Sequence, residues 1–240
     1  MLNLPQVLFL RRTFDNWCGL SSRLFQKLKS FVSDNIIEKR PSTISGELEV
    51  WYQNGKYVLH SSDANYSFDT LHRVFQKAFK RFEVKKRNPK NVLVLGFGAG
   101  SVATILCDEL KLSPHITGVE LDPEVIALAK KYFDLDRFSK LSIHLGDAAE
   151  FVQQEKTVYD LVVSDVFVDK QIPENLIRES YAENLIRLTA FGGMGIMNVI
   201  TETKSQHKAQ KQIIQWFIDR GVQPEAFQVS SINQLLMWKR

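Results

Sequence analysis

The segment 91–101, NVLVLGFGAGS, constrains the fold of this chain more than any other segment. An apolar run with the length of one buried strand leads into three glycines at alternate positions, Gly96, Gly98 and Gly100. Because glycine has no Cβ, the chain can turn tightly after the strand, and its backbone can come close to a bound nucleoside. The segment therefore predicts the first strand and ligand loop of a nucleotide-binding α/β sheet, and it leaves the identity of the ligand open.

The chain after residue 90 alternates between predicted strands and predicted helices. Two more strands follow near the C-terminus without a helix between them, which favours an antiparallel last pair. This order is typical of a doubly wound, mostly parallel, Rossmann-like α/β sheet with an antiparallel C-terminal strand. The expected strands lie near 91–96, 115–120, 141–145, 158–165 and 193–200, and the expected helices near 101–111, 122–133, 147–154, 174–189 and 204–220.

An amphipathic helix is predicted over residues 14–32, where apolar side chains recur at helical spacing with basic residues between them. Such a helix can dock on its own domain, lie on a membrane surface or pack on a partner subunit. A mitochondrial presequence is a weaker alternative, because Asp15 and Asp34 interrupt the positive charge. The residues PSTIS at 41–45 then indicate a linker, so that residues 1–45 form the first division of the chain.

A small β-hairpin unit with a helix is predicted between residues 46 and 90. Its alternating strands ELEVWYQ and KYVLHS flank an Asn-Gly pair, which is the strongest short-range signal for a hairpin. An apolar stripe over 71–82 predicts the helix, and the basic residues at 85–90 are interpreted as a solvated linker. Residues 91–240 then form the nucleotide-binding domain.

Composition narrows the classes of protein that fit. With 240 residues, 44% of them hydrophobic, the chain is long enough for one large α/β domain with a small appendage. No run approaches the roughly 18 apolar residues of a membrane span, and two cysteines are too few for a disulfide framework or a metal cluster. We therefore expect a cytoplasmic protein without a membrane span or a metal. The formal charge of +4 is concentrated in residues 1–90, outside the nucleotide domain.

Two acidic residues stand where ligands of open α/β sheets bind, just beyond the carboxyl ends of the strands. Glu120 ends the second strand, where its carboxylate can accept hydrogen bonds from both hydroxyls of a ribose. Asp147 follows the third strand and is suited to accept a hydrogen bond from an adenine amino group, to cap the next helix, or to do both. The N–H groups of Ala148 and Ala149 are further candidates for contact with the ring.

Two ligand classes compete for this arrangement. A dinucleotide site prefers the pattern G-x-G-x-x-G, whereas Ser101 occupies the last position here, and no second catalytic domain follows to place a hydride acceptor. The combination of G-x-G-x-G, an acid ending the second strand, Gly-Asp after the third and a C-terminal strand pair resembles the class I S-adenosylmethionine-dependent methyltransferase fold. The resemblance implies S-adenosylmethionine or its decarboxylated form as the ligand.

From about residue 45 onward the chain resembles the spermidine synthase family. The resemblance is carried by VLVLGFGAGS, GVELDPEVIALAKKYF, LSIHLGDAAEF, YDLVVSD and LIRESY, and the region 160–181 is the most family-specific. It implies transfer of an aminopropyl group from decarboxylated S-adenosylmethionine to a diamine, usually by a homodimer. Asp165 then takes the amine proton or positions the amine. Its alternative role is structural, as a carboxylate satisfied by neighbouring backbone N–H groups.

The chain departs from the family pattern in both catalytic loops. The first loop reads GFGAGS where the family reads GGGDGG, so Ala99 replaces the acid that faces the donor's ammonium group. Of the family segment DSSDP, Asp165 is kept, whereas Val168 takes the position of the second acid and Asp169 lies one residue later. Asp169 is therefore a candidate for the acceptor pocket.

The expected acceptor pocket also departs from the pattern. The family's gate segment, a Tyr followed by Gln or His, aligns with Phe68 and Asp69, and the Gln expected in the first strand falls at Gly46. Tyr66, Asp69 and His72 are candidates to line the pocket. The alternative for His72 is packing on a helix face beneath the sheet.

These departures change the reaction that the sequence favours. A buried ammonium without an ionic partner is strongly destabilised, so a polyamine site that lacks its acids binds poorly. Loss of the acid at Ala99 also removes repulsion against the carboxylate of S-adenosylmethionine. The sequence therefore favours a methyltransferase acting on an unidentified small molecule, with aminopropyl transfer as the alternative and a non-catalytic nucleoside-binding protein as the second alternative. The segment SDVFVD, in place of an N-P-P-Y-type motif, argues against a nucleic-acid substrate.

Overall fold

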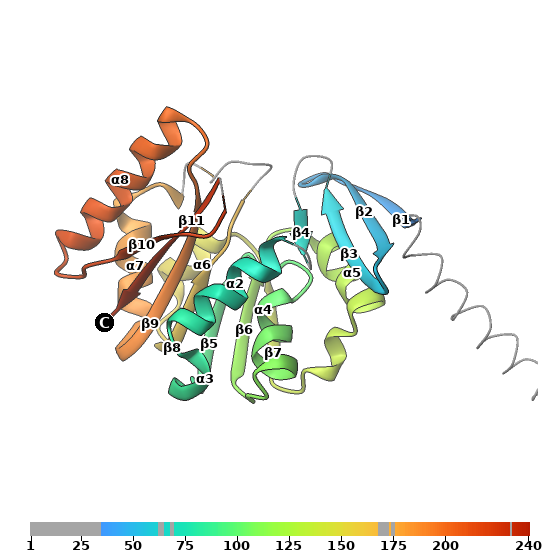
Figure 1. Cartoon of the computed structure of the whole chain (residues 1–240), viewed down its shortest axis with the longest axis horizontal. Coiled ribbons are helices and arrows are strands. Elements are labelled where there is room, and N and C mark those ends of the chain that lie inside the picture. Colours follow the sequence, from blue (N-terminus) through green and yellow to red (C-terminus); the bar gives the residue numbers. More distant parts are fainter. Residues whose placement is uncertain (1–34, 62–64, 68–69, 168–172, 174–175, 231) are drawn as a thin grey trace, which may run out of the picture.

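The computed structural model describes residues 35–61, 65–67, 70–167, 173, 176–230 and 232–240. It contains a small antiparallel sheet of four strands and a larger mixed sheet of seven strands (Figure 1). The amphipathic helix predicted over 14–32 lies outside the described residues and stays a prediction.

The small sheet has the strand order β1-β2-β3-β4. The predicted hairpin is confirmed, because β2 and β3 are joined by Asn54 and Gly55 with φ values of 49° and 75°, the left-handed conformation that a tight hairpin turn requires. The strands are β1 (Asn35–Ser42), β2 (Gly46–Gln53), β3 (Lys56–Ser61) and β4 (Asn65–Ser67).

The linker predicted at residues 41–45 is wrong for its first two residues. Pro41 and Ser42 end β1 and pair with Glu47 and Gly46 of β2. Proline is compatible with this position because β1 is an edge strand, where one side of the backbone needs no ladder hydrogen bond. The turn signals in PSTIS therefore indicate a tight connection between two paired strands.

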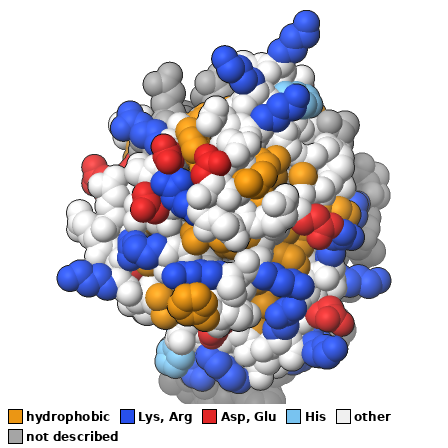
Figure 2. Space-filling view, turned by 90° about the vertical axis from the view of Figure 1, so that its left-hand side faces the viewer, with side chains coloured by type: hydrophobic (Ala, Val, Ile, Leu, Met, Phe, Trp, Pro, Cys, Tyr) orange, Lys and Arg blue, Asp and Glu red, His pale blue; other side chains and the backbone are white. Residues whose placement is uncertain are grey.

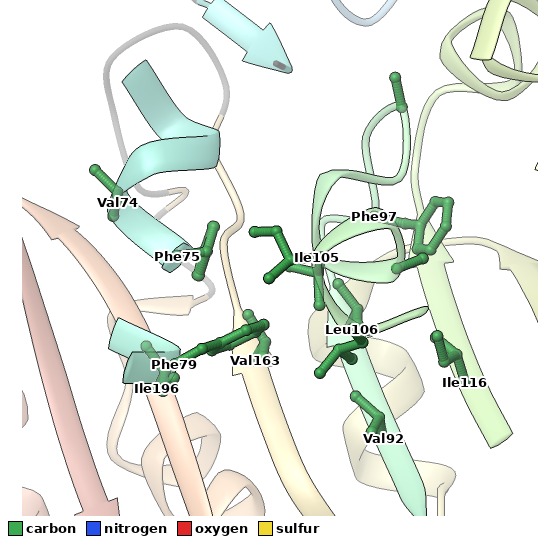
Figure 3. Packing of buried hydrophobic residues seen from close by; sticks show 14 of the residues in the cluster. Val74, Phe75, Phe79, Val92, Phe97, Ile105, Leu106, Ile116, Val163 and Ile196 are labelled. Carbon is green, nitrogen blue, oxygen red and sulfur yellow. The ribbon is translucent and has the colours of Figure 1, made fainter. Parts of the chain in front are cut away.

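The helix predicted over 71–82 is α2 (Thr70–Arg81), which lies across the larger sheet. In Figure 3, Phe75 and Phe79 of this helix lie against side chains of the sheet and of the neighbouring helix, among them Ile105, Val163 and Ile196. The basic residues after α2 form the short helix α3 (Val84–Arg87) instead of the expected linker, and their side chains are exposed.

The larger sheet has the order β10-β11-β9-β8-β5-β6-β7. Neighbouring strands from β9 to β7 are parallel, whereas β11 runs antiparallel to both β9 and β10, which confirms the predicted fold class. The strands are β5 (Asn91–Leu95), β6 (His115–Glu120), β7 (Leu141–Leu145), β8 (Tyr159–Ser164), β9 (Thr189–Ile200), β10 (Glu225–Gln228) and β11 (Asn233–Lys239).

Helices cover both faces of this sheet (Figure 1). One buried cluster joins α2, α4, η1 and α5 to one face, and a second joins α6, α7 and α8 to the other, so β5 is apolar on both sides. The helix predicted over 101–111 divides into an α-helical turn and a π-helix. The elements are α4 (Ser101–Thr104), η1 (Ile105–Glu109), α5 (Pro123–Phe133), η2 (Leu135–Arg137), α6 (Ala148–Gln154), α7 (Glu179–Leu188) and α8 (Lys204–Ile218).

The surface on the left-hand side of Figure 1 is shown in Figure 2. Lys and Arg side chains are scattered over this face among hydrophobic and uncharged groups, without gathering into one stripe. None of the helices within the described residues is long and apolar enough to cross a membrane.

Gly195 provides a test of the packing between β9 and β11. It lies opposite Trp238, and a Cβ at this position would come within 1.9 Å of the Trp238 indole, which is 1% exposed. We expect Gly195→Ala to lower the free energy of unfolding by about 3 kcal/mol, because the indole has nowhere to move. Gly192→Ala on the same strand is the control: it meets no atom within 4 Å and costs only its left-handed φ of 78°, about 1 kcal/mol. Equal losses in urea unfolding would contradict this account.

Candidate active site

The candidate site lies where β5 has β6 on one side and β8 on the other. The chain leaves β5 toward β6 and later returns to the opposite side as β8, so the loops after these strands diverge. Ligands of open α/β sheets bind at such a point, beyond the carboxyl ends of the strands. The sequence-predicted residues Gly96, Glu120 and Asp165 are all found here.

The glycine loop is strained in a way that only glycine accommodates. Gly96, Gly98 and Gly100 have φ values of 75°, 57° and 89°, in the left-handed region. A Cβ at Gly96 would lie 2.2 Å from the carbonyl oxygen of Asp165. A glycine was expected here so that a ligand could approach the backbone. At position 96 it is the protein that requires glycine, because the backbone after β8 passes directly over the turn after β5.

Glu120 is 7% exposed and is held by backbone groups. Its Oε2 accepts a hydrogen bond from Gly98 N–H (2.8 Å), and its Oε1 accepts from Leu121 N–H (2.9 Å) and Asp122 N–H (3.1 Å). Burial raises the pKa of Glu120, and these three hydrogen bonds oppose the increase. A carboxylate has about four acceptor positions, so capacity remains for a ribose hydroxyl.

Apolar surface adjoins this carboxylate. Leu121, directly after Glu120, is 40% exposed at the same strand end. An exposed leucine beside the acid that is predicted to bind a ribose offers apolar surface on which a nucleobase can pack. Leu121 was not among the site residues predicted from the sequence, although an apolar residue directly after a strand-ending acid is a signal for such a surface.

Asp147 caps the helix that follows β7. Its Oδ1 accepts hydrogen bonds from Ala149 N–H (2.6 Å) and Glu150 N–H (3.1 Å), which confirms the capping role. Ala149 N–H already donates to Asp147, and its contact with the ligand ring stays a prediction. Contacts of Asp147 and Ala148 with an adenine stay predictions.

Asp165 follows β8 and is fixed by its backbone and its side chain. Its N–H donates to the Leu95 carbonyl (2.8 Å), and its Oδ1 accepts from Asn198 Nδ2 (2.9 Å). Burial raises the pKa of Asp165 to about 7, the Asn198 hydrogen bond lowers it, and the negative charge of Glu120 raises it further. Among the described residues, the donor to this carboxylate is a side-chain amide, and no backbone N–H group there takes the role that the alternative assigns to it.

Asn198 and Asn233 are polar residues of the site that the sequence analysis missed. Asn198, 2% exposed, lies in β9, and its Oδ1 accepts a hydrogen bond from Nδ2 of Asn233 in β11 (3.2 Å). The signal was present in the run MGIMNVI, where one amide interrupts a buried apolar strand. Such a residue requires hydrogen-bond partners, and the strand-ending Asp165 is one of them.

The small sheet is attached beside Glu120. Ser42 Oγ–H of β1 donates to Asp122 Oδ2 (2.5 Å), and Asp122 caps α5 through Glu124 N–H (2.8 Å). Arg40 of β1 forms an ion pair with Glu124 (3.2 Å). The N-terminal sheet is therefore anchored to the first turn of the helix that leaves the site.

The predicted acceptor residues are only partly described. His72 is a residue of α2 and contacts η1, with its Nε2 2.6 Å from Glu109 Oε1, in a helix-packing contact. Tyr66 belongs to β4, and Asp69 and Asp169 lie outside the described residues. The acceptor pocket stays a prediction. Within the described residues, no three His, Cys, Asp or Glu side chains gather closely enough to hold a metal ion.

The seven-stranded sheet and its flanking helices have the fold of S-adenosylmethionine-dependent methyltransferases. The chain belongs to the spermine/spermidine synthase domain family, which matches residues 53–232, three quarters of its length. A solved structure of a probable spermidine synthase from Corynebacterium glutamicum ATCC 13032 has a TM-score of 0.67 at 18% identity, covering 85% of this chain and 80% of that one. This likeness concerns the fold alone.

Two curated relatives have different names. The polyamine aminopropyltransferase of Vibrio vulnificus is 29% identical over 48% of this chain and 40% of its own length. The eEF1A lysine and N-terminal methyltransferase homolog of Drosophila pseudoobscura pseudoobscura is 35% identical over 34% of this chain and 12% of its own length. The matches thus span less than half of either relative.

Replacing Asp165 tests its environment through stability. The folded-state pKa of about 7 lies above the ordinary value of 3.8, so between these values the folded protein holds a proton that the unfolded chain has released. Stability therefore falls as pH rises through this range. We expect the stability of Asp165→Asn relative to wild type to increase from pH 5 to pH 8, by on the order of 2 kcal/mol in urea unfolding. Asp136→Asn, at an exposed position, is the control, and a pH-independent difference would contradict the assignment.

Proposed function

We propose that this protein transfers an aminopropyl group from decarboxylated S-adenosylmethionine to a small amine. The observation that carries the proposal is Asp165, held beside the glycine loop with a pKa of about 7 in a member of the spermine/spermidine synthase domain family. The name of the Vibrio vulnificus relative supports the same reaction. The sequence alone favours methyl transfer, and family membership supports the alternative better, so aminopropyl transfer takes first place.

The carboxyl edge of the sheet fits the nucleoside part of such a donor. Gly98 presents backbone without a side chain, and its N–H orients the Glu120 carboxylate. Glu120 retains acceptor capacity for ribose, and Leu121 offers apolar surface for the base. We assign donor binding to these three residues.

Proton removal is the task that we assign to Asp165. The bound donor supplies a carbon made electrophilic by its sulfonium group. The amine nitrogen forms a bond to this carbon as the carbon–sulfur bond breaks, and the electron pair of that bond stays on sulfur. Because a protonated amine has no free electron pair, its nitrogen must first lose one proton to Asp165 before it can form this bond. A base with a pKa near the working pH is most effective, and the Asp165 pKa of about 7 meets this condition.

Methyl transfer from S-adenosylmethionine is the second candidate, and Ala99 favours it. The side chain of Ala99 is fully buried in the core cluster that contains Phe97. Because alanine carries only a methyl group, the position offers no carboxylate to the ammonium group of a decarboxylated donor, and none that would repel the carboxylate of S-adenosylmethionine. The Drosophila relative named as a methyltransferase is consistent with this candidate.

Donor preference separates the two candidates. We expect calorimetry to show binding of decarboxylated S-adenosylmethionine at least about tenfold tighter than binding of S-adenosylmethionine, a difference of about 1.4 kcal/mol. Glu120→Gln is the matched control and should weaken both donors alike, because it changes the ribose contact and leaves the tail contacts intact. A preference for S-adenosylmethionine would overturn aminopropyl transfer in favour of methyl transfer.

Asp165→Asn separates catalysis from binding. We expect turnover of a diamine to fall by about 100-fold or more, because the base is lost, while calorimetric affinity for the donor stays within about twofold. Asp136→Asn should retain full turnover. Donor binding by a wild-type protein that alkylates no amine would instead support the non-catalytic nucleoside-binding protein.

A further inference from the structure

Three polar residues form one row across three neighbouring strands. Ser164 of β8 pairs with Met197 of β9, so the next residues, Asp165 and Asn198, lie side by side. Asn198 pairs with Leu235 of β11, two residues after Asn233. The amide of Asn233 reaches Asn198, and the row therefore runs from β8 across β9 to β11.

This row continues the apolar face that packs against α2. Side chains alternate between faces along a strand, so residues two apart share a face. Val163, Ile196 and Leu235 belong to the cluster beneath α2, and each stands two residues from a member of the row. An apolar side chain at position 198 would pack with the apolar side chains on the same face. The residue there is instead Asn198, whose amide lies next to the candidate base.

The chemistry of the groups fixes the direction of each hydrogen bond. An ionised carboxylate only accepts, so Asn198 donates its Nδ2–H to Asp165 and turns Oδ1 toward Asn233. Asn233 then donates its Nδ2–H and turns its own Oδ1 toward Ser230, whose Oγ–H donates at 3.0 Å. Ser230 Oγ in turn accepts the backbone N–H of Asn233 at 2.9 Å. The chain of bonds thus ends on the backbone of β11, which anchors it.

We propose that Asn198 is a positioning residue for the reaction, holding one oxygen of the Asp165 carboxylate so that the other is presented to the acceptor amine, with Asn233 fixing the Asn198 amide. This role rests on the proposed function. It also explains a buried amide in an apolar strand, because burial of an amide is tolerated only where its donors and acceptor are paired.

The row also affects the pKa of Asp165, and so the pH range in which its carboxyl group is ionised. Among the described residues, the charged group that acts on Asp165 is Glu120, from β6, and it disfavours the ionised form, as burial does. The Asn198 amide favours the ionised form. The neighbouring backbone from β5, at Gly96, contributes a steric contact without a charge. Loss of the amide therefore raises the pKa of Asp165 and leaves less base at neutral pH.

The test is the titration of Asp165 in the full chain, followed by NMR of its carboxyl carbon and assigned with Asp165→Asn. We expect Asn198→Leu to move the midpoint to higher pH by about one pH unit, and the acidic limb of kcat/KM to move with it. At pH 7, kcat should fall by about fivefold, because the ionised fraction of Asp165 falls by that factor, while KM for the amine and affinity for the donor stay within about twofold. Met197→Leu, whose side chain belongs to the cluster on the opposite face, should move neither midpoint nor kcat.

A second variant keeps the proposal testable where Asn198→Leu does not fold. Asn233→Ala leaves Asn198 in place without its anchor, and we expect a smaller shift of the same sign. An unchanged Asp165 midpoint in the folded variants would overturn the positioning role. The midpoint needs no turnover, so a shifted midpoint in a protein without aminopropyl transfer would refute the proposed function alone. Normal transfer with an unchanged midpoint would refute the positioning role alone.

Discussion

The site depends on the close approach of two backbones, at Gly96 and Asp165. The Asp165 carbonyl occupies the space that a Cβ at Gly96 would need, and the Asp165 N–H donates to the carbonyl of Leu95. This contact joins the ends of β5 and β8 without using any side chain. Glu120 joins from β6 through the N–H of Gly98. The glycine loop and the two acids are therefore placed by contacts at the ends of the strands, which need no ligand.

The small sheet extends this rigid edge. Glu38 of β1 accepts hydrogen bonds from Lys131 and Tyr132 of α5, and with Arg40 these groups lower its pKa to about 2. Single exposed ion pairs contribute little to stability, but here several groups and the Ser42 contact act along one edge. The β-unit is thus tied to α5 by side chains, although the sequence separates the two into different divisions of the chain.

The sequence predicts the features that depend on local residue patterns, such as strand bounds and tight turns. It does not predict the features that depend on contacts between distant segments. The bounds of β6 and β7 were predicted without error, because each is a short segment with β-branched or alternating apolar residues that ends at a turn or a helix cap. Asn54 and Gly55 predicted their hairpin, because the turn needs their left-handed conformation. Pro41 led to the wrong prediction of a linker, because only the pairing of β1 with β2 shows that this proline lies in an edge strand. Asn198 was missed because a search for apolar periodicity ignores an amide whose partners come from other strands.

A cationic acceptor would lower the pKa of Asp165 and so favour the ionised carboxylate that its own reaction needs. An unliganded Asp165 with a pKa of about 7 is only partly ionised at neutral pH, because burial and Glu120 oppose its charge. A polyamine brings positive charge, and a positive charge within about 4–6 Å of a carboxyl lowers its pKa. The acceptor therefore increases the fraction of base as it binds. A neutral acceptor provides no such effect, so the environment of Asp165 suits an amine, even though Ala99 has replaced the acid expected beside the donor.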